Sequence, residues 1–265
     1  MGKGIDMSVG STYWLSDYGR LSSAPKWLVR SSTVVLFFVS WELVGRSRKL
    51  FAVVPFSEVV ARLLEDQGKL WTAAAGTLKI AAIGFILGAL AGLAVGSLLG
   101  SSRLARTAFE PIVNVGVVTP MTMMIPVIGI YAGLQTRGKL LLVFMFVFFT
   151  IAINTSAGVA ETPASLIETG RAFSLGRFRR YTKIVFPSAL PYILLGLRLG
   201  AGRAVQGAII ADLLLRVENL GAYLVRSGSI FDMTSLLAGT FFTVLLASAV
   251  MVGARVLERR LLAWL

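Results

Sequence analysis

Long apolar runs alternate with short polar connections along most of the 265-residue chain. A run of about 20 apolar residues can cross a hydrocarbon core, and in lipid it must be helical because its backbone groups have no water to bond. Six runs of this kind can be drawn, at residues 29–46, 76–100, 108–133, 139–159, 188–213 and 235–256. The pattern predicts an all-α integral membrane protein with one transmembrane domain over residues 29–265.

The connection between the fourth and fifth runs has a pattern of its own. Residues 160–187 are too many for a tight turn and carry a cluster of cations. A first short helix can end at Gly176, and a second can follow until Pro187 stops it. The alternative is a solvated basic loop on lipid headgroups, which the apolar Phe173 and Leu175 at the turn disfavour. We therefore expect two short helices beneath the membrane.

Composition supports the membrane assignment and excludes several chemistries. The chain is 56% hydrophobic and 15% charged, and it contains no cysteine and no histidine. Disulfides, thiolate catalysis, Cys/His zinc sites and histidine proton relays are therefore excluded. Phosphate-loop, zinc-protease and nucleophile-elbow motifs are also absent from the sequence. We expect no catalytic residues and no metal site, and any ATP that drives the protein must be bound by another chain.

The formal net charge of +13 changes the picture less than it would in a soluble protein. The cations flank the apolar runs, so lipid headgroups, rather than nucleic acid, are their expected partners. Six spans place both termini on one side, and a modest positive-inside bias puts that side in the cytoplasm. Residues 1–28 are then a cytoplasmic segment. The first 26 residues hold no apolar core, which disfavours a cleaved signal peptide.

The second run contains glycines at every fourth position. Gly84, Gly88, Gly92 and Gly96 lie on one helix face, where a neighbouring backbone can approach closely. The sequence therefore predicts tight helix packing along this face, and a direct role in transport is the less favoured alternative.

Polar groups within the fifth run are candidates for a translocation pathway, because a charge in hydrocarbon is costly. Arg203 can contact a transported anion, or it can form a structural ion pair or bond to carbonyls; Gln206 lies close to it in sequence. Asp212, at the end of the run, is expected to face water or to cap a neighbouring loop.

The third run is interrupted by PMTMMIP at residues 120–126. Proline bends a helix and frees backbone carbonyls, and methionine packs adaptably. Thr119, Met121 and Met124 are therefore further pathway candidates, with simple kinked packing as the alternative.

The 160–187 connection resembles the EAA loop of the membrane subunits of bacterial ABC importers, which is E-A-A-x-x-x-G followed after nine residues by I-x-L-P. The matching positions are Glu168, Ile184 and Pro187. The departures are Thr169 and Gly170 for the two alanines, Phe186 for the leucine and Ser174 for the glycine.

Other segments resemble the nitrate, sulfonate and taurine branch of the same permeases. They are the P-x-S-E-V at residues 55–59, INTSAG at 153–158, PSALPYILLGLRLGAGRA at 187–204, ENLGAYLVRSGSIFD at 218–232 and LERRLLAW near the end. The resemblance begins at about residue 35 and continues to the end of the chain.

This resemblance implies a type I ABC importer permease fold with six transmembrane helices and a cytoplasmic coupling helix, in a bacterial cytoplasmic membrane. It implies two cytoplasmic ATPase subunits that bind ATP and magnesium, a second permease copy, and an extracytoplasmic solute-binding protein. The chain itself would bind no cofactor. The residues implied in ATPase coupling are Glu168, Gly170, Phe173, Ser174, Leu175, Gly176 and Pro187.

The implied activity is ATP-driven import of a small anion, such as a sulfonate, taurine or nitrate, by alternating access. A secondary transporter driven by an ion gradient is the alternative, but it would favour inverted repeats and a mid-membrane carboxylate relay, which the sequence lacks. A membrane-embedded enzyme would need a nucleophile or metal set, which is also missing.

Overall fold

The computed structural model describes residues 26–47 and 53–262, and every regular element within these ranges is helical. The first elements are α1 (Lys26–Arg46), α2 (Phe56–Glu65), α3 (Gln67–Ser101), α4 (Arg103–Val118), the 3-10 helix η1 (Met121–Met124) and α5 (Ile125–Ala132). They are followed by α6 (Thr136–Ala160), α7 (Ala164–Ala172), α8 (Arg177–Arg180), the π-helix η2 (Tyr181–Val185), α9 (Phe186–Leu214), α10 (Asn219–Ser229) and α11 (Met233–Leu262). Of the segment expected over 1–28, residues 1–25 lie outside the described ranges.

The chain divides into two units, residues 1–61 and 62–265, and the boundary falls within α2. In the first unit, α1 is tied to the chain that follows it. The Glu42 carboxylate accepts hydrogen bonds from the Ser57 backbone N–H at 2.9 Å and from its hydroxyl at 2.8 Å. The Trp41 indole donates to the Val54 carbonyl at 3.0 Å. These bonds satisfy polar groups at the end of an apolar helix.

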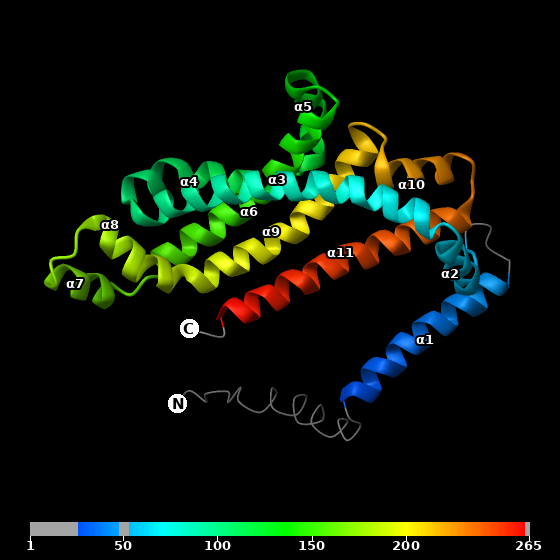
Figure 1. The fold of residues 1–265 in the computed structure, drawn as a ribbon, viewed down its shortest axis with the longest axis horizontal. Coiled ribbons are helices and arrows are strands. Elements are labelled where there is room, and N and C mark those ends of the chain that lie inside the picture. Colours follow the sequence, from blue (N-terminus) through cyan, green and yellow to red (C-terminus); the bar gives the residue numbers. More distant parts are fainter. Residues whose placement is uncertain (1–25, 48–52, 263–265) are drawn as a thin grey trace, which may run out of the picture. The chain divides into compact units, whose positions relative to one another are not determined.

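The core of the second unit is formed by α3, α6 and α9, and α6 packs along both of the others (Figure 1). Its buried centre consists of Ala81, Ala89, Val143, Val147, Ile151, Ala204 and Ala208. Small residues dominate on α3 and α9, and β-branched residues on α6 fill the space between them. This pairing of small and branched residues brings the helix axes close together.

The glycine row of α3 lies against α6. A Cβ on Gly84 would come within 2.4 Å of Val143, one on Gly88 within 2.8 Å of Val147, and one on Gly92 within 3.0 Å of Ile151. At Gly96 it would lie 2.6 Å from a backbone carbonyl oxygen, that of Ala152. No side chain fits at these positions without moving α6.

The third apolar run is not the continuous helix expected over residues 108–133. The chain leaves helical geometry at Thr119 (φ −64°, ψ 127°), because the residue before a proline is disfavoured in the α conformation. The segments Arg103–Val118 and Met121–Ala132 are bent by 98° relative to each other. The interruption at Pro120 is therefore a break in the span and not a kink within it.

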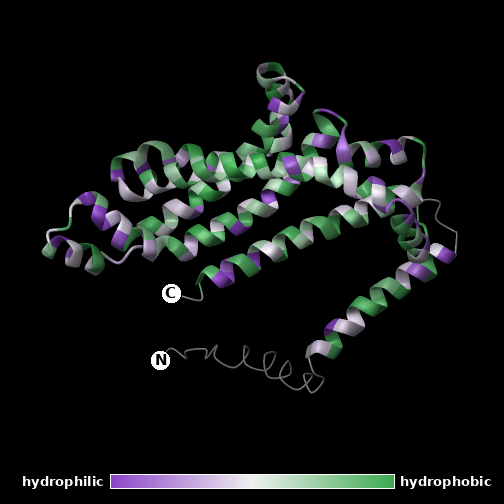
Figure 2. Cartoon of the chain, in the orientation of Figure 1, coloured by the Kyte–Doolittle hydropathy of each residue, from purple (hydrophilic) through white to green (hydrophobic). Residues whose placement is uncertain are grey.

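Five described helices are long and apolar enough to span a membrane, and the bent pair would make a sixth. Figure 2 shows that apolar residues cover most of α3, α6 and α11, whereas polar residues gather at α7 and α8. The α7–α8 segment lies at one end of the second unit and α10 at the other (Figure 1).

The helices in the 160–187 connection differ from expectation at both ends. The first ends at Ala172 and not at Gly176, which instead precedes α8 in extended geometry (φ −59°, ψ 159°). Pro187 does not stop the second, since helical structure runs from Arg177 to Leu214. The π-turn Tyr181–Val185 directly precedes α9, whose second residue is Pro187. Its wider backbone hydrogen bonding makes room for the proline ring, which would clash with the carbonyl group of the preceding turn in a regular α-helix.

Candidate functional site

A cavity of about 240 Å³ opens where the third span is broken. Its lining includes Thr119, Pro120 and Met121 from the break, Phe149 and Thr150 from α6, and Arg203, Gln206 and Ile210 from α9. Four of the five residues proposed for the pathway from sequence thus meet around one space. The fifth, Met124, does not line it and packs against the cluster around Met121 and Leu142.

The electrostatics of this cavity are set by a single cation. Arg203 is exposed, and one of its guanidinium nitrogens donates to the Gln206 amide oxygen at 3.2 Å. No carboxylate is among the lining residues. The remaining guanidinium donors of Arg203 can therefore bind a small oxyanion.

The other arginine of α9 has a structural role. Arg198 donates to the Glu258 carboxylate of α11 at 2.8 Å, with both side chains mostly buried. This pair joins α9 to α11, so among the two arginines of the span only Arg203 is available to a solute.

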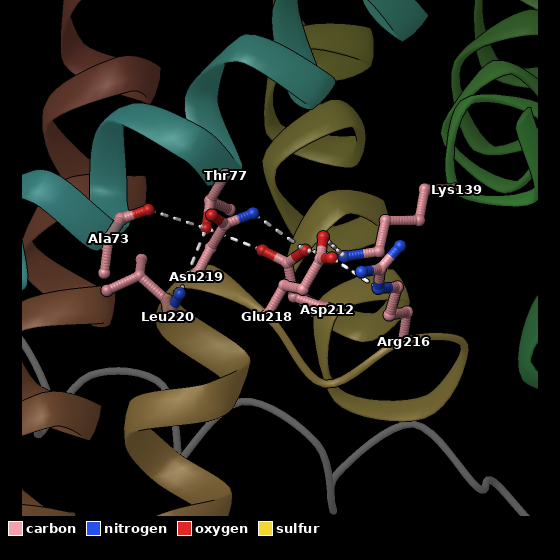
Figure 3. A network of polar contacts seen from close by, with 8 residues as sticks. All are labelled: Ala73, Thr77, Lys139, Asp212, Arg216, Glu218, Asn219 and Leu220. Atoms are coloured by element: carbon pink, nitrogen blue, oxygen red, sulfur yellow. Dashed lines mark hydrogen bonds and ion pairs between the residues drawn. The ribbon is translucent and has the colours of Figure 1, made fainter. Parts of the chain in front are cut away.

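A second polar site lies at the α10 end, where a buried network joins three spans (Figure 3). The Lys139 ammonium on α6 donates to Asp212 on α9 at 2.6 Å and to Glu218 at 3.1 Å. The other Asp212 oxygen accepts from the Thr77 hydroxyl of α3 at 2.7 Å. Arg216 pairs with Glu218, which completes a set of two cations and two carboxylates.

Burial and helix geometry explain why this network must be complete. Lys139 and Asp212 have side-chain exposures of 1% and 0%, where an unpaired charge would be very costly. Lys139 is also in the first turn of α6, where the helix dipole disfavours a cation, so the two carboxylates offset both effects. The network fixes the ends of α3, α6 and α9 relative to one another.

The expectation that Asp212 faces water was therefore wrong, because it is buried and ion-paired. The alternative that it caps a neighbouring loop agrees with the bond that its carboxylate accepts from the Asn219 amide at 3.3 Å. Lys139 was missed altogether, because it stands at the edge of an apolar run where a cation usually reaches the headgroups. The available signal was that each is a charge at the edge of an apolar run. The pairing itself spans 73 residues and leaves no local pattern.

The third site is the turn after α7, which has the bonding of a Schellman motif. The Leu175 N–H donates to the Gly170 carbonyl at 3.0 Å, and the Ser174 N–H donates to the Arg171 carbonyl at 2.8 Å. Ser174 has φ 52°, in the left-handed region that glycine occupies without strain. The position where the EAA motif carries glycine is thus the one that terminates the helix.

The other residues implied in coupling lie around this turn with distinct surroundings. Gly170 is buried against the second helix, where a Cβ would meet the Ile184 side chain at 2.6 Å. Glu168 is exposed on α7, and Phe173 at the tip is 77% exposed. Close packing at Gly170 holds α7 against η2. Phe173 and Glu168 are therefore both exposed on a segment whose position is fixed.

Comparison with known proteins places these features in a family. The family model described as "Binding-protein-dependent transport system inner membrane component" matches residues 84–263. The relative named as the aliphatic sulfonates transport permease protein SsuC of Bacillus subtilis is 32% identical over 185 residues, covering 69% of this chain and 67% of its own length. The taurine transport system permease protein TauC of Escherichia coli is 27% identical and covers 79% of each chain.

A further relative and one solved structure extend the comparison. The nitrate import permease protein NrtB of Leptolyngbya laminosa is 28% identical over 159 residues, covering 60% of this chain and 57% of its own. A chain from an inward-facing structure of the MetNI methionine ABC transporter aligns with a TM-score of 0.63 at 22% identity, covering 73% of this chain and 96% of that one. The latter likeness concerns the fold.

Proposed function

The chain belongs to the family of binding-protein-dependent transport system inner membrane components, and on that premise we propose that it imports a small anion through the cavity at Arg203. Membership makes it a permease subunit of an ABC importer, a transport component whose ATPase is a separate chain. The ion-gradient-driven alternative has no support from any of these relatives.

We propose that the α7–α8 end faces the cytoplasm and the α10 end faces outward. The cations of α7, α8 and the last turn of α11 gather toward the first end, as the positive-inside rule requires of a cytoplasmic face. The chain contains no cysteine, so single replacements at the exposed Ser174 and Ser229 can be labelled selectively. Ser174→Cys should react only from the cytoplasmic side and Ser229→Cys only from outside; the reverse would overturn this orientation.

The partners that we propose come from family membership, and the orientation gives the end at which each would bind. Two ATPase subunits that bind ATP and magnesium would grip the α7 turn, where the exposed Phe173 can enter an apolar cleft and Glu168 can meet a cation. A second permease copy would complete the pathway, and a solute-binding protein would dock at the α10 end. Closure of the ATPases then biases the pair between two states, and the solute shifts that balance only by its differential affinity for them.

The anionic substrate rests on one observation: the cavity holds a lone arginine and no carboxylate. Its volume of about 240 Å³ lies just below the usual range for ligand sites, which suits a solute of a few heavy atoms. The sulfonate and nitrate relatives are named for anions, and the taurine relative for a zwitterion that carries a sulfonate group.

The test is uptake into proteoliposomes that contain the permease, its ATPase and its binding protein, with nitrate, a short alkanesulfonate, zwitterionic taurine and uncharged glycerol as probes. Arg203→Gln should lower anion uptake at least about tenfold, as for loss of a charge-assisted bond, while basal ATP hydrolysis persists. Lys79→Gln is the matched control, since Lys79 is an exposed cation on α3 away from the cavity. Anion uptake that is equal in Arg203→Gln and wild type would overturn the proposal.

A further inference from the structure

A cavity of about 710 Å³ at the α7–α8 end is lined by five arginines. They come from three places in the chain: Arg103 and Arg106 from the start of α4, Arg171 from α7, and Arg177 and Arg180 from α8. Ser101, Ser102 and Tyr181 add hydroxyl groups to the lining. The cavity therefore joins the α3–α4 turn to the two short helices of the 160–187 connection.

Within the described ranges 26–47 and 53–262, these arginines have no partner for their charge. No carboxylate lines the cavity, and among the residues that the structure describes none of the five guanidinium groups forms an ion pair or a hydrogen bond. Arg106 and Arg180 are nevertheless half-buried. Five cations held around one space repel one another unless an anion lies between them.

The position of the cavity along the apolar spans indicates the kind of anion. Its walls include Ser101 and Ala160, the residues at which two apolar spans end. Leu104 and Phe178, which directly follow the lining residues Arg103 and Arg177 in the sequence, are 82% and 80% exposed, so apolar side chains are available on the same helices as the cations. A charged headgroup with attached acyl chains matches this arrangement, because headgroups lie where the hydrocarbon stops.

We propose that this cavity binds the phosphate group of an anionic phospholipid. The phosphate oxygens accept bonds from Arg106 and Arg180 at the half-buried side of the cavity, and the acyl chains leave along the apolar side chains at its rim. The lipid then bridges the α3–α4 turn and α8. Gly170 of α7 packs against the Arg180 side chain of α8 and Ile184 of η2. This binding is independent of the transported solute and of Arg203.

The experiment is native mass spectrometry of the complete permease–ATPase complex released from nanodiscs of phosphatidylcholine with phosphatidylglycerol. Wild type should retain phosphatidylglycerol in preference to phosphatidylcholine. Arg106→Gln combined with Arg180→Gln should lower that retention about 25-fold, taking about fivefold for each arginine. Arg179→Gln, which removes an exposed arginine of the same helix that does not line the cavity, should leave retention unchanged.

A charge-preserving double variant, Arg106→Lys with Arg180→Lys, should restore most of the retention and so exclude a general folding defect. Unchanged retention in the double glutamine variant would overturn the proposal. Displacement of the lipid by excess inorganic phosphate, with no preference for phosphatidylglycerol in wild type, would also overturn it and assign the cavity to a soluble anion.

Discussion

At the scale of single residues, the positive φ of Ser174 explains why the EAA motif carries glycine at this position. The motif glycine stands at the residue that closes a Schellman turn, where φ is positive. A non-glycine residue in this conformation costs about 1–2 kcal/mol. The hydrogen bond from the Leu175 N–H to the Gly170 carbonyl encloses Ser174 and helps to offset this cost.

Ser174→Gly should therefore stabilise the turn by about 1 kcal/mol, because glycine removes the left-handed strain. Amide hydrogen exchange at residues 173–176 should slow about fivefold. The same chemical change at Ser165, an exposed helical residue of α7, should have the opposite sign, at about 0.5 kcal/mol. Faster exchange in Ser174→Gly would contradict the assignment of this turn.

The buried Lys139–Asp212 pair supports a second prediction. Lys139→Met or Asp212→Leu alone should destabilise the protein by about 3–5 kcal/mol, because the first leaves the buried Asp212 carboxylate without a cation and the second leaves the buried Lys139 with only the more exposed Glu218. Lys139→Met with Asp212→Leu should cost clearly less than the sum of the two. Thermal unfolding in detergent measures this, with Arg62→Met, from the exposed Arg62–Glu65 pair, as the control at under about 1 kcal/mol. Additive losses would show that the two charges do not interact.

The pair also shows what the sequence could and could not reveal at this scale. Arg203, Gln206, Thr119 and Met121 could be selected one by one, because a polar or helix-breaking residue inside an apolar run is locally visible. Lys139 could not be assigned a partner, because its contacts come from α9 and from the chain after it. The cavity itself depends on where the broken span turns, which no local pattern gives.

At the scale of elements, helix contacts follow residue size. The glycine row of α3 allows α6 to approach. On the α9 side of α6, Gly196 faces Asn154 and Gly200 faces Ile151. This period of four could be read from the sequence. The continuous helix through residues 181–185 could not, because it requires a π-turn that accommodates Pro187.

Gly96→Ala should destabilise the α3–α6 contact by about 1–3 kcal/mol, because its Cβ would lie 2.6 Å from the Ala152 carbonyl oxygen. Gly253→Ala in α11 is the matched control, since nothing lies within 4 Å of its Cβ position. That variant should gain about 0.5–1 kcal/mol from helix propensity. The midpoint of thermal unfolding reports both changes, and equal shifts would refute the packing argument.

Asp66, which directly precedes α3, joins that helix to Tyr223 of α10 and has a shifted pKa. Bonds from Lys69 and from the Tyr223 hydroxyl hold the pKa of Asp66 below its usual range. The unfolded state then binds more protons, so Asp66 stabilises the fold above its unfolded pKa of about 3.9 and loses that contribution as pH falls through the lower folded value. Burial and Asp66 raise the pKa of Tyr223 to about 12, so its contribution is lost only as pH rises from about 10 toward that value.

Asp66→Asn should therefore flatten the fall of the unfolding midpoint between about pH 5 and pH 3, because it removes the group that titrates there. The measurement is thermal unfolding in detergent across this range. An identical acid profile in wild type and variant would show that Asp66 does not contribute.

At the scale of the whole molecule, the two sites at opposite ends of the α3–α6–α9 core have different roles. The α10 end is fixed by the buried Lys139–Asp212 pair, whereas the α7 turn carries an exposed aromatic side chain that can contact a partner. The cavity at Arg203 lies between the helices that connect them, since α6 and α9 line it. Movement imposed at the turn can reach the cavity through these rigid helices.

The central claim is that ATP hydrolysed by the partner drives solute through this chain by way of the α7 turn. Its most direct test measures ATP hydrolysis and anion uptake together in proteoliposomes of the complete transporter. Glu168→Arg on α7 should abolish both solute-stimulated hydrolysis and uptake, whereas Glu161→Arg, an exposed glutamate just after α6, should retain them. Uptake by Glu168→Arg at the wild-type rate, or uptake by wild type without ATP, would contradict the account.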